Sequence, residues 1–386
     1  MAEITREPDL RVRLATGLPS VTVSGTGAIE LHDGRRRRTL EPPLRVQRRG
    51  GQILVSGRGS ADDTAFGPAL TLSPAAGSPT LTVDRVAGER RSYPGRLSFH
   101  AREGRDGLEL INTVQLEDYL PGVLEKELVP DWHDNAFRAQ AVAARSYALW
   151  ERSRNRAKGR AYDVHASTAS QVYGGVTRAL KPRQAVRATR GQVLVWDAAV
   201  VPAYFSSTAG TRGADGAKVW PQAAPDIPPL RGRDYGAWDA RSPRYRWPEV
   251  SRPADGVARQ LAAWGQRRKH PVAELKGLTG IRLVERHRSG RPATFRLTDA
   301  AGRTADLGAD DLRHVFNDVE GQGTAYSGDF VPDVNSGRLT LRDGRGFGHG
   351  VGLSQFGAQA MAQAGHPVQT ILGAYYPGAT IHRAYR

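Results

Sequence analysis

The first third of the chain constrains the fold most strongly, because it consists of short segments in which apolar and polar residues alternate. Residues 10–114 contain the segments LRVRLA, SVTVSG, AIELH, QILVSG, LTVDRV and LELINTV, separated by turns of Gly, Asp and Ser. A period of two residues is typical of β-strands with one buried face. No helix of ordinary length fits between these segments. We therefore predict a β-rich N-terminal region over residues 1–112, a barrel or sandwich that serves as a scaffold, with wall binding as the alternative.

A short helix is predicted directly after the strands, between Pro121 and Pro130. Proline suits the first turn of a helix and disrupts its interior, which confines this helix to about two turns. Glu127 lies three residues after Leu124 and four after Val123, so helical spacing places it on the apolar stripe. A carboxylate on the buried side of a helix loses hydration, which tends to raise a carboxyl pKa and suits a general acid. The alternative is a glutamate at the edge of the core that reaches solvent or pairs with an arginine.

An alanine-rich helix is predicted next, beginning at Ala136 and capped by Asp134 or Asn135. Its apolar face carries, at helical spacing, residues Phe137, Ala141, Ala144 and Ala148. Gln140 and Arg145 border this face, and we expect them to position a polar substrate or to hold the carboxylate of the preceding helix. The alternative is that both residues only flank a helix–helix contact.

Five separated blocks of the chain resemble the SpoIID/LytB group of bacterial cell-wall proteins, in the family's order. The blocks are LEDYLPGVLEKEL, FRAQAVAARSYAL, YDVHASTASQVYGG, VPAYFSSTAG, and GRGFGHGVGLSQFGAQAMA together with ILGAYYPGATI. The resemblance implies a lytic transglycosylase, because SpoIID-type members cut the glycan strands of peptidoglycan, and it places the catalytic glutamate at Glu127. LytB-type members are described as modifiers of a wall amidase instead. The resemblance therefore leaves enzyme and helper open.

The third block resembles a loop that binds zinc in some SpoIID relatives through two cysteines and a histidine. His165 and Ser170 stand at the cysteine positions and Ala169 at the histidine position, and the chain has no cysteine. One histidine cannot hold a structural zinc ion, which needs four ligands, so we predict no metal and no cofactor. Gln171 and Tyr173 do match the family pattern, and a polar loop with an aromatic residue suits contact with a sugar. A turn packed against a sheet is the alternative.

Two strands joined by a turn at Asp197-Ala198 are predicted before Ser206 and Ser207. Hydroxyl groups at the end of a strand commonly line a cleft, so we expect both serines to bind sugar. A serine nucleophile with His349 as base is disfavoured. FSSTAG differs from the G-x-S-x-G elbow of hydrolases, and the sequence offers no evident acidic partner.

Glycines alternate from Gly344 to Gly352 in the last block, where we expect close approach of the backbone or positive φ angles. The pattern fits neither a phosphate-binding loop nor a dinucleotide fingerprint. His349 lies among these glycines, and Ser354 and Gln355 begin the following helix. With the resemblance, we expect His349 to form hydrogen bonds or shuttle a proton beside the catalytic glutamate, and Ser354 and Gln355 to contact substrate. A structural loop histidine is the alternative.

A change in composition near residue 231 divides the rest of the chain. Residues 231–339 are rich in Pro and Arg and predict a helix and two strands, which resembles a module inserted into the family's catalytic core. We therefore predict a catalytic core at 113–230 and 340–386 that is interrupted by an α/β module at 231–339. The predicted fold class is α+β, with a β-rich N-terminal part before a core of helices and sheets.

The predicted site is a cleft where the Glu127 helix, the Ser206 loop and the His349 loop meet. The predicted reaction cleaves the β-1,4 bond between N-acetylmuramic acid and N-acetylglucosamine and closes a 1,6-anhydro ring. A hydrolase would need a second carboxylate. Glu117 and Asp131 are the nearest candidates, and we assign Glu117 to capping or structure. The alternative function is a non-catalytic wall-binding enhancer of an N-acetylmuramoyl-L-alanine amidase.

The net charge of +16, from 55 Lys and Arg against 39 Asp and Glu, favours anionic partners. The basic run Arg35 to Arg38 lacks interleaved aromatic residues, so nucleic acid is not expected. We expect peptidoglycan glycan strands as substrate, particularly strands stripped of stem peptides, and an amidase as the alternative partner. No apolar run is long enough to span a membrane, and the first residues lack a hydrophobic signal region. If the resemblance holds, the protein acts in the cell envelope after an export signal has been removed.

Overall fold

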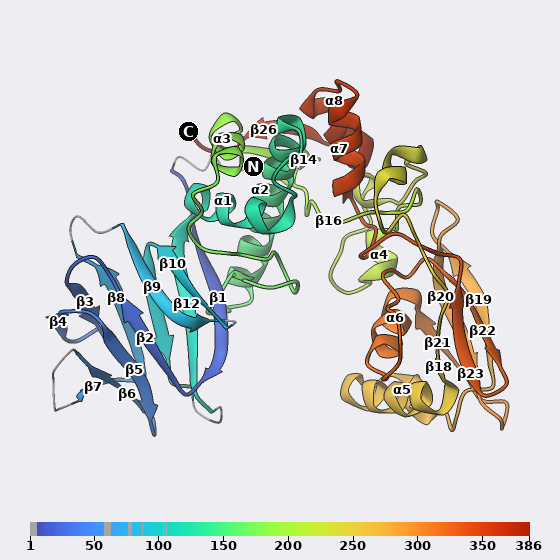
Figure 1. Ribbon diagram of the computed structural model, residues 1–386, viewed down its shortest axis with the longest axis horizontal. Coiled ribbons are helices and arrows are strands. Elements are labelled where there is room, and N and C mark those ends of the chain that lie inside the picture. The colour runs from blue at the N-terminus through green and yellow to red at the C-terminus, as the bar shows by residue number, and fades with distance from the viewer. Residues whose placement is uncertain (1–5, 58–62, 76–78, 87, 103, 105) are drawn as a thin grey trace. The chain divides into compact units, whose positions relative to one another are not determined.

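A computed structural model describes residues 6–57, 63–75, 79–86, 88–102, 104 and 106–386 of the chain (Figure 1). The chain forms two compact units, which we call unit 1 (residues 1–202 with 381–386) and unit 2 (residues 203–380). The fold is α+β with a β-rich N-terminal part, as predicted. The predicted domain division placed residues 203–230 and 340–380 in the catalytic core. In the structure, both segments belong to the same compact unit as residues 231–339.

Unit 1 begins with the predicted strands, which form two sheets. The strands are β1 (Asp9–Leu18), β2 (Ser20–Ser24), β3 (Ile29–His32), β4 (Arg37–Leu40), β5 (Leu44–Arg49), β6 (Gln52–Ser56), β7 (Thr64–Phe66), β8 (Ala69–Pro74), β9 (Thr80–Val86), β10 (Glu89–Pro94), β11 (Arg96–His100) and β12 (Leu108–Gln115). One sheet has the order β13-β1-β12-β11-β8-β3-β4, where β13 is Val164–His165, and the other has the order β10-β9-β2-β5-β6-β7. In β3, Ile29 and Leu31 are buried while Glu30 and His32 are exposed, so the alternation sorts side chains between core and solvent.

The strand β12 continues directly into helix α1 (Leu116–Glu127). The prediction of a two-turn helix starting near Pro121 is wrong, because this proline lies inside a longer helix. The first turn is stabilised from outside the helix. The N–H of Leu116 donates to the carbonyl of Pro8 at 3.1 Å, and the N–H of Glu117 donates to Oε1 of Glu7 at 2.9 Å. These partners satisfy helix N–H groups that otherwise lack acceptors, so the helix starts before the proline.

The second helix, α2 (Asp134–Ala157), buries the predicted face, namely Phe137, Ala141, Ala144 and Ala148. Its cap is His133 rather than Asp134 or Asn135, because the His133 side chain accepts a hydrogen bond from the N–H of Asn135 at 3.1 Å. Helices α1, α2 and α3 (Leu180–Ala188) pack against one another, and α2 also packs on strand β14 (Gln192–Trp196).

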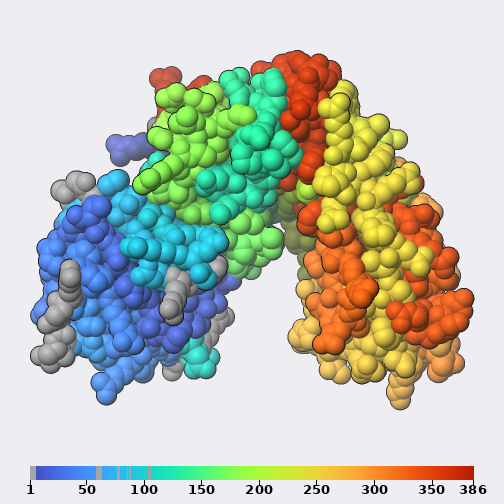
Figure 2. All heavy atoms as spheres, viewed as in Figure 1, coloured from blue at the N-terminus to red at the C-terminus, as the bar shows by residue number. Residues whose placement is uncertain are grey.

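The first strand and the turn of the predicted hairpin are present in unit 1, but the second strand, predicted over Val200–Phe205, covers only Ala199–Val200. β14 pairs with β15 (Ala199–Val200) through a turn in which Asp197 and Ala198 have φ angles of 47° and 55°, as a type I′ turn requires. On its other side β14 adjoins β26 (Thr380–Arg383), so the chain returns to unit 1 at its end. The N–H of Ala384 donates to the carbonyl of Gly191 at 2.8 Å. Figure 2 shows the blue strands of unit 1 next to its teal and green helical part.

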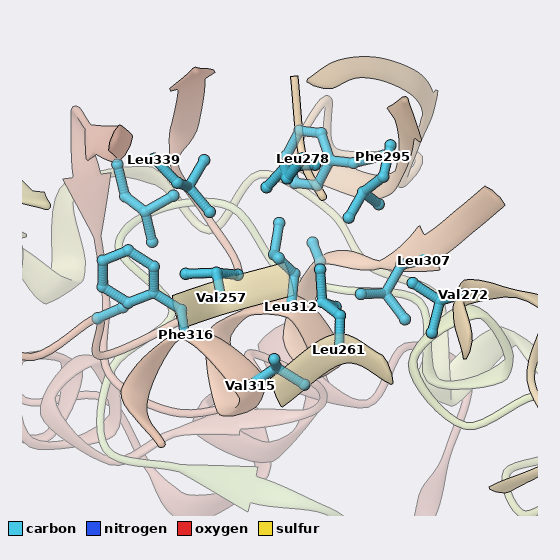
Figure 3. Packing of buried hydrophobic residues seen from close by; sticks show 14 of the residues in the cluster. Val257, Leu261, Val272, Leu278, Phe295, Leu307, Leu312, Val315, Phe316 and Leu339 are labelled. Carbon is cyan, nitrogen blue, oxygen red and sulfur yellow. The ribbon is translucent and has the colours of Figure 1, made fainter. Parts of the chain in front are cut away.

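Unit 2 has its own hydrophobic core. Helices α5 (Ala254–Arg268) and α6 (Ala309–Asn317) pack with two sheets, whose orders are β19-β20-β21 and β18-β23-β22. Figure 3 shows side chains of both helices and of the strands converging on this core. The predicted helix, the two strands and the Ser289-Gly290 turn between them are present, since β19 and β20 pair across Gly290, which has a φ angle of 83°.

The remaining elements of unit 2 have the following bounds. The strands are β16 (Phe205–Ser206), β17 (Arg246–Trp247), β18 (Val250–Pro253), β19 (Gly280–Arg286), β20 (Pro292–Thr298), β21 (Thr304–Gly308), β22 (Val331–Asn335), β23 (Arg338–Arg342), β24 (Gly344–Arg345) and β25 (Leu353–Ser354), and the helices are α4 (Gly216–Val219), α7 (Gln355–Gln363) and α8 (Val368–Tyr375). Short 3₁₀ helices lie at Pro228–Leu230, Gly236–Arg241 and Pro271–Glu274.

Candidate functional site

Glu127 is the last residue of α1, and its side chain is half-buried. The helix buries the residues that precede it on the same face, namely Leu120, Val123 and Leu124, while Glu125 and Lys126 are exposed. The N–H of Val172 donates to Oε1 of Glu127 at 3.0 Å. The carboxylate is thus oriented by a backbone donor and still reaches solvent, which suits a group that exchanges a proton with a ligand.

The loop that carries this donor is anchored by Gln171 and Tyr173, both fully buried. Nε2 of Gln171 donates to the carbonyl of Ala144 at 3.2 Å, and Oε1 of Gln171 accepts from the hydroxyl of Tyr119 at 3.1 Å. The hydroxyl of Tyr173 donates to Oδ1 of Asn112 at 3.3 Å. The side chains of Gln171 and Tyr173 thus form their hydrogen bonds with other residues of unit 1. We infer that the two residues support the loop from inside, which agrees with the alternative of a packed turn.

A second glutamate of α1, Glu117, forms a buried ion pair with Arg145 of α2. Nε and Nη2 of Arg145 donate to the two carboxylate oxygens of Glu117, each at 2.9 Å, and Arg145 is completely buried. The hydroxyl of Tyr385 and the N–H of Gly191 also donate to Glu117. Burial opposes ionisation of Glu117, but the hydrogen bonds and charge of Arg145 outweigh it, so the pKa of Glu117 lies below its usual range. Arg145 therefore holds a carboxylate, that of Glu117 rather than that of Glu127.

Gln140 differs from its neighbours on α2 in having an unsatisfied side chain. It is fully buried, and neither amide atom has a hydrogen-bonding partner among the residues that the structure describes. Nearly all buried polar groups in proteins are hydrogen-bonded, so an exception points to a function or a bound group. Gln140 stays among the residues that we propose for substrate binding.

His349 lies in the predicted glycine-rich loop of unit 2. Positive φ angles occur, as predicted, at Gly346, Gly348, Gly350 and Gly352. Nδ1 of His349 accepts a hydrogen bond from the N–H of Val351 at 3.0 Å, and the ring meets Trp220 edge-on at 4.8 Å. Loss of hydration lowers the pKa of His349 to about 4, against the opposing charge of Asp310. The ring is therefore neutral near pH 7 with its proton on Nε2, which favours hydrogen bonding over proton shuttling.

Ser206 lies beside this loop. Strands β16 and β25 pair in parallel, which aligns Ser206 with Ser354. A Cβ atom on Gly348 would lie 2.7 Å from Cβ of Ser206, so only glycine allows the two segments to approach this closely. The Ser206 hydroxyl is buried and finds no hydrogen-bonding partner within the described ranges. Ser207, the next residue, is half-buried.

Ser354 and Gln355 are buried at the start of α7. The hydroxyl of Ser354 donates to Oδ1 of Asp239 at 2.6 Å and accepts from the N–H of Gly357 at 3.4 Å, so it caps the helix. The other oxygen of Asp239 accepts from the hydroxyl of Thr208 at 2.8 Å. Asp239 thus links the serine loop to α7, a role that no motif in the sequence indicated.

The predicted site residues fall into two groups. Unit 1 contains Glu127, Gln140, Arg145, Gln171 and Tyr173, whereas unit 2 contains Ser206, Ser207, His349, Ser354 and Gln355. The structure joins Glu127 to the loop at Gln171 and Tyr173, and it joins Ser206 to the His349 loop. The cleft that would unite both groups stays a prediction. Val172 escaped sequence reasoning because it contributes a backbone N–H, which any residue type supplies.

Over the described part of the chain, no three His, Cys, Asp or Glu side chains are grouped so as to hold a metal ion. None of the helices described here combines the length and the apolar character that crossing a membrane requires.

Comparison with known proteins relates this chain to sporulation and cell-wall proteins. A family model described as stage II sporulation protein, SpoIID, matches residues 104–196, and a domain of unknown function matches residues 230–352. The amidase enhancer of Bacillus subtilis is 23% identical over 334 residues, which are 78% of this chain and 45% of that protein. An uncharacterized protein of Brachyspira hyodysenteriae is 30% identical over 298 residues, 75% of this chain and 72% of that protein. Stage II sporulation protein D of Bacillus subtilis is 27% identical over 298 residues, 72% of this chain and 78% of that protein. The chain thus spans less than half of the amidase enhancer and about three quarters of the other two proteins.

Proposed function

The chain belongs to the SpoIID family, and from this premise we propose that it cleaves the glycan strands of peptidoglycan as a lytic transglycosylase with Glu127 as its catalytic residue. The observation that carries the proposal is the contrast between Glu127 and Glu117, two of the three glutamates of α1. Glu127 is half-buried, oriented by the N–H of Val172 and accessible. Glu117 is enclosed by Arg145 and Tyr385. Glu127 thus combines a fixed orientation with access to solvent, which supports a reaction that needs a single carboxylate to donate and recover a proton.

In the proposed reaction, the carboxylic acid of Glu127 protonates the glycosidic oxygen while the bond from C1 of N-acetylmuramic acid to that oxygen breaks. N-acetylglucosamine leaves with the proton, and positive charge develops at C1. The Glu127 carboxylate then takes the proton of the C6 hydroxyl of the same muramic acid. The C6 oxygen bonds to C1, which closes a 1,6-anhydro ring and returns Glu127 to its acid form. No water is consumed.

A two-carboxylate hydrolase is disfavoured by the surroundings of the other acidic groups. Glu117 has its pKa lowered and both oxygens bound by Arg145, so it cannot activate a water molecule without breaking the ion pair. Glu125 and Asp131 are exposed on the surface. Exposed carboxylates lack the fixed orientation that a general base or nucleophile requires.

We place this activity in the cell envelope, where peptidoglycan is found, and propose glycan strands without stem peptides as the preferred substrate. The proposed binding residues are Gln140, Ser206, Ser207, His349, Ser354 and Gln355, with Arg145, Gln171 and Tyr173 in support. The net charge of +16 favours the approach of this protein to an anionic wall.

A second candidate function is that of a non-catalytic enhancer of a wall amidase. The observation that favours it is the similarity to the amidase enhancer of Bacillus subtilis, which extends over 78% of this chain. Such a protein would bind the wall and increase the release of stem peptides only when its amidase partner is present.

The test is incubation of the full chain with purified glycan strands, followed by mass spectrometry of the products. We expect ends of 1,6-anhydro-N-acetylmuramic acid, which are lighter than hydrolysis products by one water. Glu127→Gln should reduce cleavage by roughly 10²–10⁴-fold, because an amide cannot donate and recover the proton. Its circular dichroism and unfolding midpoint should match those of the parent protein.

Glu125→Gln is the matched control, since it changes an exposed glutamate of the same helix and should cleave like the parent. Normal cleavage by Glu127→Gln would contradict the assignment. Products with reducing ends instead of anhydro ends would show that the protein is a two-carboxylate hydrolase. Intact strands, with stem peptides released only when an amidase is added, would favour the enhancer.

A further inference from the structure

A cavity of about 600 Å³ lies within unit 2. Its walls come from α4 and the residues after it, the end of α5, the start of β20, the start of α6, and His349. Figure 1 labels α4, α5 and α6 in this part of the chain. A volume between roughly 300 and 1,000 Å³ is typical of sites that bind small molecules. Most of the lining belongs to residues 230–352, which match a domain of unknown function.

Two tryptophans give the cavity rigid aromatic surfaces. Trp220 packs on Tyr204 with ring centres 4.6 Å apart and meets the ring of His349 at 4.8 Å. The guanidinium of Arg268 lies 4.6 Å from the ring centre of Trp264. Trp220 is thus held in place by its neighbours before any ligand arrives. A fixed aromatic face is suited to the C–H face of a pyranose ring, because both surfaces are flat and apolar.

Polar groups of both signs line the same space. Lys218 and Arg268 supply donors, and Asp311 in the first turn of α6 supplies a carboxylate. Nη1 of Arg268 donates to Oδ1 of Asp311 at 3.2 Å, and this exposed pair can rearrange around a ligand. Loss of hydration raises the pKa of Asp311. A wall that offers both donors and acceptors, and whose carboxylates Asp310 and Asp311 would repel a phosphate, suits an uncharged ligand with many hydroxyl groups.

We propose that this cavity binds an uncharged sugar ring of a β-1,4-linked glycan through residues of the inserted segment, beyond the role proposed for His349. Trp220 would receive the apolar face of the ring. Asp311 and Arg268 would bind its hydroxyl or acetamido groups. That the ligand is an uncharged sugar follows from the residues that line the cavity. That this sugar is N-acetylglucosamine rests on the proposed function.

The test measures binding of N,N′,N″-triacetylchitotriose to the full chain by titration calorimetry. Every protein in the series carries Glu127→Gln, so that no cleavage interferes. Asp311→Asn should weaken binding about tenfold, because an amide loses the charge-assisted hydrogen bonds of the carboxylate. Trp220→Leu should weaken it by at least as much. Asp311 is at the surface of α6, so its replacement keeps the fold even if the tryptophan variant does not.

Asp318→Asn is the matched control, since Asp318 caps the other end of α6, is exposed and does not line the cavity. It should bind like the parent. Unchanged binding in Asp311→Asn, or no binding of the trisaccharide at millimolar concentration, would overturn the inference. Glycan cleavage is measured separately with Glu127 intact. If the protein does not cleave glycan but binds the trisaccharide in a way that depends on Asp311, only the proposed transglycosylase activity is rejected. If the protein cleaves glycan but Asp311→Asn binds the trisaccharide as the parent does, only the proposed sugar site is rejected.

Discussion

At the scale of single residues, the ion pair between Glu117 and Arg145 distinguishes Glu117 from Glu127 in helix α1. Both members of the pair are buried, and their hydrogen bonds connect α1 and α2 to the end of the chain through Tyr385. Removing one member of a buried pair leaves the other charge without compensation in a poorly hydrated site. Glu117 is thus a structural glutamate ten positions before the candidate catalytic one.

We predict that Glu117→Gln lowers the free energy of unfolding by about 3–5 kcal/mol. The pH dependence tests the cause. The pKa of Glu117 is lower in the folded state, so the ion pair stabilises the protein above the unfolded pKa of about 4.3, and this stabilisation is lost as the pH falls through the folded pKa. Urea unfolding at pH 7 and at acidic pH should therefore show a smaller acid-induced loss in Glu117→Gln than in the parent. Equal losses would contradict this account. Glu125→Gln, on the surface, should change stability by less than about 0.5 kcal/mol.

At the scale of elements, α1 and the loop that holds Glu127 approach each other through a glycine. A Cβ atom on Gly122 would lie 2.0 Å from the carbonyl oxygen of Gly175 and 3.0 Å from the ring of Tyr173. The carbonyl of Gly122 also accepts from the N–H of Gly174 at 3.1 Å. This close contact between α1 and the loop places the N–H of Val172 within hydrogen-bonding distance of the Glu127 carboxylate.

We predict that Gly122→Ala reduces glycan cleavage and lowers the free energy of unfolding by about 1–3 kcal/mol, because the methyl group forces the loop away from α1. Cleavage rates and urea midpoints are the measurements. Gly373→Ala is the control, since this glycine of α8 has open space around it and alanine is the better helix former. It should leave cleavage unchanged and stability unchanged or higher by up to about 1 kcal/mol. A Gly122→Ala protein with parental activity and stability would show that the close approach is unimportant.

At the scale of the whole molecule, unit 2 is inserted between two parts of unit 1. The chain leaves unit 1 after Pro202 and returns to it at Ile381, where β26 adjoins β14. The last residues complete unit 1, because Tyr385 donates to Glu117 and Ala384 donates to Gly191. Unit 1 therefore depends on residues that are synthesised after all of unit 2.

We predict that Tyr385→Phe lowers the free energy of unfolding by about 1–2 kcal/mol, since it removes one hydrogen bond to a charged and buried acceptor. Denaturant unfolding is the measurement. Tyr245→Phe in unit 2 is the comparison, because this tyrosine is only half-buried, and the change should have little effect. Equal effects of the two changes would contradict the role of the C-terminal residues.

Local patterns in the sequence determined many of the elements. Alternation predicted the strands before α1, the Ala-rich face predicted α2, and the positive φ angles from Gly346 to Gly352 followed from the glycines. These features depend on periodicity and on the angles that a residue allows, which neighbours in sequence set by themselves. The same reasoning placed Glu127 within the apolar stripe of its helix, where the structure finds it half-buried at the helix end.

Only the tertiary structure decided the partners of those elements. The first turn of α1 is capped by Glu7, Arg145 is bound to Glu117, and the donor to Glu127 is the N–H of Val172. Each contact joins residues that are distant in sequence, so no local period encodes it. The position of Pro121 was predicted wrongly for the same reason. Proline favours the start of a helix, but here Glu7 and Pro8 accept hydrogen bonds from the N–H groups of an earlier turn, so the helix begins before Pro121.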